Sequence, residues 1–126
     1  MSHALLEDRP PTANEVQRAL DAYIAAVRVH YGPRLHDIQL FGSRARGDAR
    51  PDSDADVAVI INDNEWQFWQ EKMLLADLTY EPLIEEGLVI QPWPVSLRDW
   101  RDPAQHHNPR FIEAIKRDGR SLLVPT

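Results

Sequence analysis

The stretch DADVAVII at residues 54–61 places the strictest limit on how this chain can fold. Its run of apolar residues predicts a β-strand, in which alternate side chains point to opposite faces. Asp54 and Asp56 then share one face with Ala58 and Ile60, whereas the residues between them face the other way. Two like charges therefore stand close together at the point where a strand enters the core.

The segments around this strand predict the other elements. An amphipathic helix follows Pro10-Pro11, with a capping box formed by Thr12 and Glu15 and a stop at Gly32-Pro33. The remaining expected elements are a strand at 36–43, a polar loop with one short helical turn at 43–53, a helix at 64–87 kinked near Pro82, a strand at 88–95, a helix at 108–119 and a tail strand at 120–124. The two prolines of the strand at 88–95 suggest either an edge position or an early end. This order predicts an α/β (α+β) domain in which helices flank a small mixed sheet.

Composition excludes several classes of function. The 126 residues suit one domain, spanning residues 1–126, with a core of moderate size. A net charge of −6 argues against an extended nucleic-acid surface, and the absence of cysteine rules out disulfides and zinc–thiolate sites. We see no signal-peptide pattern, and the longest aliphatic run, VAVII, is too short to span a bilayer, so we expect a cytoplasmic protein without a membrane partner.

The two aspartates have two interpretations. Residues i and i+2 of a strand point the same way, so the two carboxylates repel, and burial would raise the pKa of at least one of them. A magnesium ion removes this penalty, because it prefers oxygen ligands and commonly uses one or two carboxylates together with substrate phosphates. The alternative is a solvated strand entry after the turn-forming residues PDSD.

A Gly-Ser pair upstream favours the metal interpretation. Gly42-Ser43 directly follows an apolar strand, and glycine permits close approach of another group to the backbone. Ser43 can cap a following turn whose free N–H groups would face an anion. Arg44, Arg46 and Arg50 add positive charge to the loop. Alone, the pair could be a simple tight turn, but together with the aspartates it predicts a unit that holds a polyphosphate and its metal.

These residues resemble a known signature. Gly42-Ser43, ten further residues and then Asp54-Ala55-Asp56 are similar to the motif of the polymerase-beta-like nucleotidyltransferases, above all the minimal ones, and the match covers about residues 38–61. The resemblance implies that Gly42 and Ser43 contact the triphosphate, with Arg46 as a weaker candidate, and that Asp54 and Asp56 are catalytic and hold Mg²⁺. It also implies transfer of a nucleoside monophosphate, expected to be AMP from ATP, to an acceptor hydroxyl.

One part of the family pattern is missing. Active members carry a third carboxylate on a later strand, and the corresponding strand, GLVIQPWPV, contains no acid. Gln91 stands where that acid is expected, and an amide oxygen can bind a metal but is a poor base. Three explanations stay open: Gln91 is a weak substitute, another acid such as Glu85, Glu86 or Asp99 reaches the site, or the protein binds nucleotide without efficient catalysis.

Three functional hypotheses follow. The first is a magnesium-dependent nucleotidyltransferase whose acceptor is a partner protein, because the chain has no room for a second domain that would bind a drug-like acceptor. The second is a nucleotide-binding antitoxin or regulatory subunit, and the third is a structural domain with an accidental motif. The resemblance implies a small helical toxin as the partner. The heavy apolar stretch from Trp66 to Leu78 is expected to pack in the core, and the alternative is a helix that is apolar on more than one face, which fits a homodimer or another partner surface.

Overall fold

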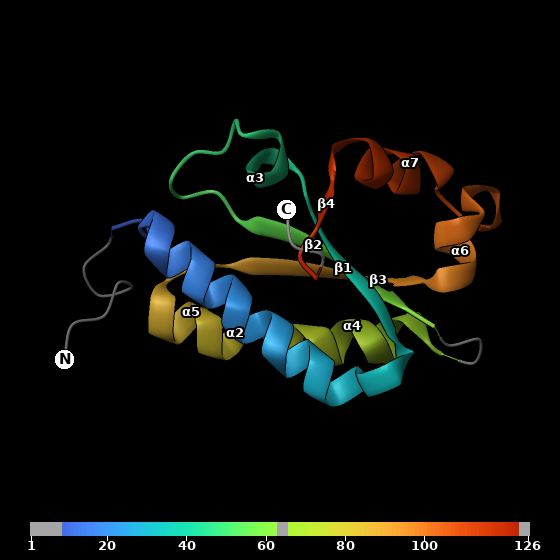
Figure 1. Cartoon of the computed structure of the whole chain (residues 1–126), viewed down its shortest axis with the longest axis horizontal. Coiled ribbons are helices and arrows are strands. Elements are labelled where there is room, and N and C mark those ends of the chain that lie inside the picture. The colour runs from blue at the N-terminus through green and yellow to red at the C-terminus, as the bar shows by residue number, and fades with distance from the viewer. Residues whose placement is uncertain (1–8, 63–65, 124–126) are drawn as a thin grey trace.

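A mixed four-stranded sheet forms the centre of the molecule, in the strand order β3-β2-β1-β4. The computed structural model describes residues 9–62 and 66–123. The strands are β1 (Leu35–Phe41), β2 (Ala55–Ile61), β3 (Ile90–Ser96) and β4 (Arg120–Ser121). β1 pairs antiparallel with β2 and β4, whereas β2 and β3 run parallel. The predicted mixed sheet with flanking helices is confirmed (Figure 1).

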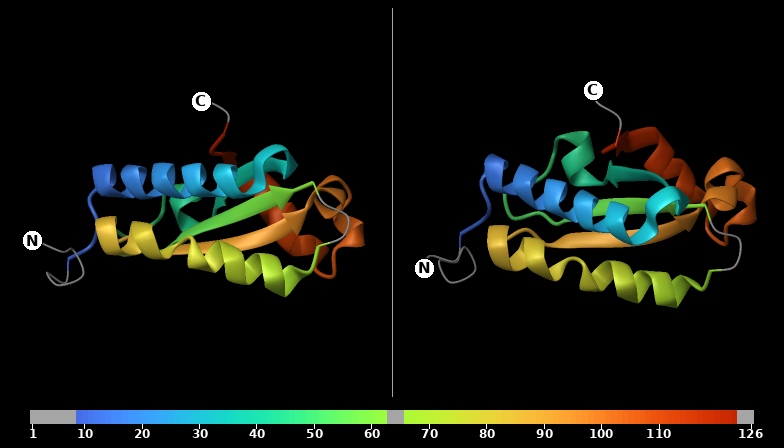
Figure 2. Two further views of the ribbon diagram at one scale, coloured as in Figure 1. Left: turned by 90° about the horizontal axis from the view of Figure 1, so that it is seen from below. Right: turned by 60° about the horizontal axis from the view of Figure 1, so that its bottom comes forward.

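Helices lie on both sides of this sheet. One layer contains α2 (Ala13–Tyr31), α4 (Phe68–Asp77) and α5 (Tyr80–Glu86), and the other side carries α6 (Leu97–Arg101) and α7 (Pro109–Asp118) (Figures 1 and 2). The short helix α3 (Ser43–Arg46) follows the end of β1, and two 3₁₀ turns occupy Gly32–Arg34 and Pro103–Gln105. None of the helices in the described ranges has the length and apolar character that crossing a membrane requires.

The central strand β2 contributes to two cores. Its residues Val57, Val59 and Ile61 pack with α2 and α4, whereas Ala58 and Ile60 pack with Ile112 and Ile115 of α7. All of these side chains are fully buried. The alternation predicted for residues 54–61 is therefore correct, and the face that carries Asp56 is the face that α7 partly covers.

The predicted first helix is confirmed at both ends. The Thr12 hydroxyl accepts a hydrogen bond from the Glu15 backbone N–H, and the Glu15 carboxylate accepts one from the Thr12 N–H, at 3.2 and 2.8 Å. This reciprocal pair is the capping box that the sequence indicated. Gly32 ends the helix with a positive φ of 55°.

The prediction of one continuous, kinked helix at 64–87 is wrong. The segment forms two helices, α4 and α5, and the break lies at Leu78 and Thr79 rather than at Pro82. Proline has no N–H for the carbonyl four residues earlier, and its ring collides with that carbonyl, so Pro82 interrupts the helix one turn before itself. Residues 64 and 65 of the predicted helix lie outside the described residues.

The helix α6 was missed. It contains only five residues, and its N-terminus is marked by Ser96, whose hydroxyl accepts a hydrogen bond from the Asp99 N–H at 3.1 Å. The expected edge position of β3 is confirmed, because β3 stands at the end of the strand order and, among the described residues, pairs with β2 alone. An edge strand tolerates proline, which has no N–H to donate to a neighbouring strand. The carbonyl of Pro92 accepts a hydrogen bond from the Lys72 ammonium group.

Candidate active site

Asp54 and Asp56 lie at the end of the sheet where β2 begins. Asp56 is half-buried and is paired with Phe41 of β1 on one side and Gln91 of β3 on the other. Asp54 immediately precedes the strand and is exposed. Since the two residues are two positions apart on extended backbone, both carboxylates belong to the face that α7 covers only farther along the strand.

Burial and like charge act together on Asp56. Its pKa is raised above the ordinary value, first because burial penalises the charged form and second because the Asp54 carboxylate lies near, whereas Arg46 acts in the opposite direction. A divalent cation would relieve both penalties. Two carboxylates and the amide oxygen of Gln91 are hard oxygen donors of the kind that magnesium prefers, so this set of residues fits that ion.

Gly42 brings the backbone directly against Asp56. Its φ is 75°, a conformation that favours glycine, and a Cβ placed there would lie 2.4 Å from the Asp56 Oδ2. Any other residue would therefore collide with the carboxylate. The sequence predicted that glycine would permit a close approach to the backbone here, but not that the approaching group would be the Asp56 carboxylate.

Ser43 does not take the capping position predicted for it. Gly42 is the N-cap of α3, and Ser43 is the first helical residue, with no side-chain cap present. The reason is geometric, because the positive φ that only glycine adopts easily is needed at position 42 to turn the chain out of β1. Gly47, with a φ of 84°, ends this single helical turn.

Two arginines of the loop have different surroundings. Arg46 is half-exposed, lies 3.3 Å from the Asp48 carboxylate and 3.9 Å from that of Asp118, and its charge reaches Asp56. Arg44 instead donates hydrogen bonds to the carbonyl of Ser53, at 3.0 and 2.7 Å, and to that of Pro51. Arg46 thus lies near enough for its charge to act on Asp56, whereas Arg44 ties the loop together, a role that the sequence did not reveal.

Gln91 lies beside both aspartates. It is the strand neighbour of Asp56, and its Nε2 is 3.3 Å from the Asp54 Oδ2. The amide therefore occupies the position where a third carboxylate was expected.

The three acids considered as substitutes do not join the pair. Within residues 9–62 and 66–123 no group of three acidic or other metal-binding side chains occurs. Glu86 is engaged by the Arg18 guanidinium at 3.1 Å, and Asp99 follows the opposite end of β3. Glu85 is exposed on α5. Among the described residues, the explanation that another acid completes the site is wrong.

Comparisons with known proteins agree with this geometry. The model of a nucleotidyltransferase domain family matches residues 22–121. The "Putative protein adenylyltransferase MJ0604" of Methanocaldococcus jannaschii is 32% identical over 74 residues, which is 59% of this chain and 67% of that protein.

Two solved structures share the fold. A toxin-antitoxin crystal structure with AMP-PNP is 21% identical with a TM-score of 0.55, over 82% of this chain and 72% of that one. The CdnE cyclic dinucleotide synthase of Elizabethkingia meningoseptica, with GTP and Apcpp, is 19% identical with a TM-score of 0.52, over 76% of this chain but only 44% of the synthase. Because the family model spans most of the chain, the protein belongs to the nucleotidyltransferase domain family and is a nucleotidyltransferase.

Proposed function

We propose that this protein binds ATP with Mg²⁺ and transfers AMP to a hydroxyl group of a partner protein in the cytoplasm. The observation that carries the proposal is the convergence of Asp54, Asp56 and Gly42 at one end of the sheet, with Gly42 in close contact with the Asp56 carboxylate. Arg46 adds a positive charge that acts to lower the pKa of Asp56. These residues supply a metal-binding pair and a phosphate-binding turn in one place.

The reaction needs positioning more than covalent chemistry from the protein. The acceptor oxygen forms a bond to the α-phosphorus, the bond from that phosphorus to the bridging oxygen breaks, and pyrophosphate leaves. Asp54 and Asp56 would hold the metal, which neutralises phosphate charge when bound. Gly42 and Ser43 would contact the phosphates through the backbone turn, and Arg46 would face the leaving pyrophosphate.

The acceptor proton has no strong base to receive it. Gln91 cannot take a proton, and no third acid stands beside the pair within the described residues. The proton would therefore pass to water, and we expect slow transfer.

A protein acceptor and a toxin partner are supported by the names of the relatives rather than by this chain's own contacts. The relative from Methanocaldococcus jannaschii is named as a protein adenylyltransferase, and one structural neighbour is a toxin-antitoxin complex with AMP-PNP. Our proposal for this chain is that a small helical toxin is the acceptor. A homodimer is the other association that we propose.

A second candidate function rests on Gln91. Its amide hydrogen-bonds to Asp54 in the place of an acid, so the protein could bind ATP and a partner while transferring AMP very slowly. In that case it would act as a nucleotide-binding antitoxin or regulatory subunit.

The decisive experiment is label transfer. Each nucleoside triphosphate, labelled at the α-phosphate, is incubated with the protein and Mg²⁺ in an extract of the source cells, with a chelator as a blank. Wild type is compared with Asp54→Asn and with the matched control Asp52→Asn, an exposed aspartate of the same loop. We expect a labelled protein band from ATP with wild type and the control, and none with Asp54→Asn or the chelator.

The other outcomes separate the candidates. Nucleotide binding without any labelled band would support the second function. If Asp54→Asn binds nucleotide as wild type does, the metal assignment is wrong. Unfolding of Asp54→Asn would mean that the aspartate pair is structural, whereas loss of like-charge repulsion predicts an intact or slightly more stable fold.

A further inference from the structure

An aromatic pocket lies at the open edge of β3, and its residue Trp93 shares the face of the sheet that carries the aspartate pair. Its residue Trp93 pairs with Ala58, two positions along the strands from the pairing of Gln91 with Asp56. One such step is roughly 6.6–7 Å. The pocket therefore begins about one step into the sheet from the proposed phosphate and metal site.

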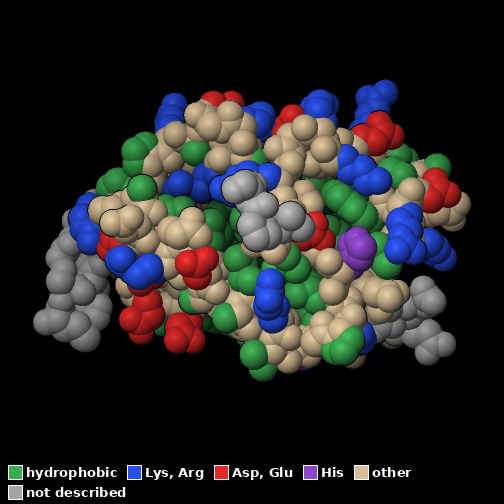
Figure 3. Space-filling model, in the orientation of Figure 1, with side chains coloured by type: hydrophobic (Ala, Val, Ile, Leu, Met, Phe, Trp, Pro, Cys, Tyr) green, Lys and Arg blue, Asp and Glu red, His purple; other side chains and the backbone are tan. Residues whose placement is uncertain are grey.

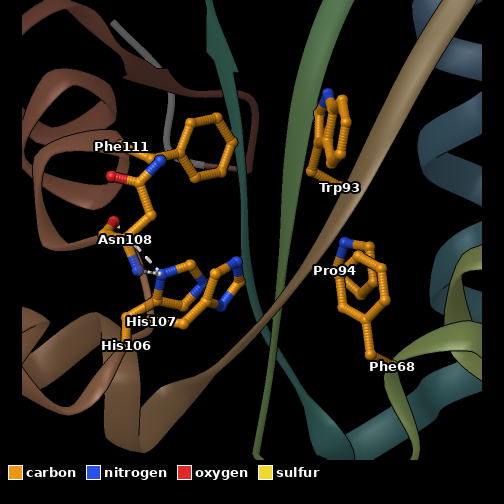
Figure 4. Close-up of a pocket in the computed structure, with 7 residues that line it drawn as sticks. All are labelled: Phe68, Trp93, Pro94, His106, His107, Asn108 and Phe111. Atoms are coloured by element: carbon orange, nitrogen blue, oxygen red, sulfur yellow. Dashed lines mark hydrogen bonds between the residues drawn. The ribbon is translucent and has the colours of Figure 1, made fainter.

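Two separate parts of the chain form the pocket walls (Figure 4). Phe68, Trp93 and Pro94 come from α4 and β3, and the opposite wall comes from the start of α7 and the loop before it. The residues of that second wall are His106, His107, Asn108 and Phe111. The cavity between the walls has a volume of about 220 Å³. Most of its lining is apolar or aromatic, with polar groups near one edge, which is typical of small-molecule sites.

Trp93 is held as a fixed platform. The Phe111 ring meets it edge-on with centroids 5.8 Å apart, and the Lys72 ammonium lies 4.0 Å from the centre of its ring. Lys72 is itself bound to the carbonyl of Pro92. Despite these contacts, 36% of Trp93 is exposed. A large aromatic ring that is fixed and yet open is suited to stacking against another flat ring.

We propose that this pocket binds the base of the nucleoside triphosphate, stacked against Trp93. The inference rests on the proposed function, because it takes the phosphates to lie at Gly42 and Asp56. α3 and Arg46 lie beyond the end of the sheet, the aspartates lie at that end, and the pocket lies in the opposite direction along the edge strand β3. A nucleotide whose terminal phosphates face α3 would extend its ribose and base towards Trp93.

The wall on α7 adds polar contacts at the edge of the base. Asn108 carries an amide that can donate and accept, and it lies beside Phe111 in the pocket (Figure 4). The His106 ring is stacked on His107 with centroids 4.3 Å apart, and its Nδ1 accepts a hydrogen bond from the Asn108 backbone N–H. These contacts fix the edge of the pocket.

Binding measurements with two probes test this inference. The probes are α,β-methylene ATP, whose bridge cannot be cleaved, and inorganic tripolyphosphate, which has no base; both are titrated with Mg²⁺. Trp93→Leu keeps an apolar contact with Phe111 but removes the ring. We expect it to weaken binding of the nucleotide about tenfold to a hundredfold, the usual loss of one base-stacking contact, and to leave tripolyphosphate binding unchanged.

Two further variants provide a second test of the pocket and a control. His107→Ala removes an exposed ring from the opposite wall and should weaken nucleotide binding in the same selective way, even if Trp93→Leu alters packing. Trp69→Leu is the matched control, because that tryptophan is 72% exposed on α4 and does not line the pocket. Nucleotide should quench tryptophan fluorescence in wild type and in the Trp69 variant, but not in Trp93→Leu.

The result that overturns the inference is an unchanged affinity of Trp93→Leu and His107→Ala for α,β-methylene ATP. The inference is also overturned if these variants raise only the KM for the acceptor, because the pocket would then bind the acceptor and not the base. Failure of wild type to bind either probe would instead contradict the proposed function. The two failures are therefore distinguishable.

Discussion

At the scale of single residues, Gly42 links backbone geometry to the site. Gly42→Ala places a Cβ against the Asp56 carboxylate in a backbone conformation with φ of 75°, so we expect loss of stability and displacement of Asp56. Gly47→Ala is the matched control, since its φ is 84° but no atom lies within 4 Å of the added Cβ. Both variants should lose about 1–3 kcal/mol of unfolding free energy in urea titrations, and only Gly42→Ala should also lose nucleotide transfer.

Equal loss of transfer in the two glycine variants would contradict this argument. It would show that the loop conformation as a whole, rather than the approach of Gly42 to Asp56, controls the site.

Gln91 permits a gain-of-function prediction. Gln91→Asp places a carboxylate beside Asp54 and Asp56 and could receive the acceptor proton, so the rate of AMP transfer should rise about a hundredfold, the lower range of general-base effects. Stability without Mg²⁺ should fall, because a third like charge joins the pair. Gln91→Ala serves as the control and should show no gain. A folded Gln91→Asp protein without faster transfer would mean that position 91 is not the third catalytic position.

The sequence predicts that the main residues of the site lie together, but it does not predict every residue that forms the site. Asp54, Asp56 and Gly42 could be identified because the alternation of side chains along a strand and the conformational freedom of glycine are both visible in short stretches of sequence. The binding of Arg44 to distant loop carbonyls has no such local signal. Neither has the pocket around Trp93, because its walls come from segments that are far apart in the chain.

At the scale of elements, the loop at 43–53 depends on one arginine. Arg44→Ala removes three hydrogen bonds to the carbonyls of Pro51 and Ser53, next to Asp54. We expect a loss of about 1.5–3 kcal/mol of unfolding free energy, as for hydrogen bonds of charged groups, and weaker ATP binding. Arg50→Ala, an exposed arginine of the same loop, should change neither quantity. Calorimetric measurement of unfolding and of nucleotide binding checks both; similar effects of the two variants would refute the assignment.

The capping box of α2 predicts a pH dependence. A hydrogen bond from Arg9 and one from the Thr12 backbone lower the pKa of Glu15 to about 2. Since the folded-state pKa lies below the unfolded value, the stabilisation is present above about pH 4.5 and is lost as the pH falls towards 2. Glu15→Gln should therefore be less stable than wild type at pH 7, and this difference should shrink across that window. A difference that stays constant down to pH 2 would contradict the role of the charge.

Helices with local start and stop signals could be predicted at both ends, whereas a very short helix and the exact break in a long one could not. The ends of α2 follow from its capping box and from Gly32, which act within one turn. The proline predicts an interruption near Pro82, but it does not decide between a kink in one helix and the two separate helices that the structure has. The five residues of α6 are too few for a helical period to be recognised.

At the scale of the whole molecule, α4 and α5 present apolar side chains to solvent. Trp69 and Met73 on α4 are 72% and 64% exposed, and Tyr80 and Ile84 on α5 are 63% and 54% exposed. Each pair is four residues apart and so shares one side of its helix. The exposed acids of the same helices are Asp77, Glu81 and Glu85. On the face drawn in Figure 3, by comparison, acidic and basic side chains are interspersed.

These acids should decide how the apolar surface associates. In a symmetric dimer through α4 and α5, like charges would meet like charges, and the net charge of −6 adds to the repulsion. We therefore expect a monomer at low salt, and a dimer fraction that rises with NaCl as the screening length falls from about 10 Å at 0.1 M to about 3 Å at 1 M. Analytical ultracentrifugation measures this directly. Met73→Gln should abolish the rise, whereas Val29→Gln, at an 86% exposed position on α2, should not. A dimer that weakens with salt would show that oppositely charged groups, rather than this apolar surface, hold two copies together.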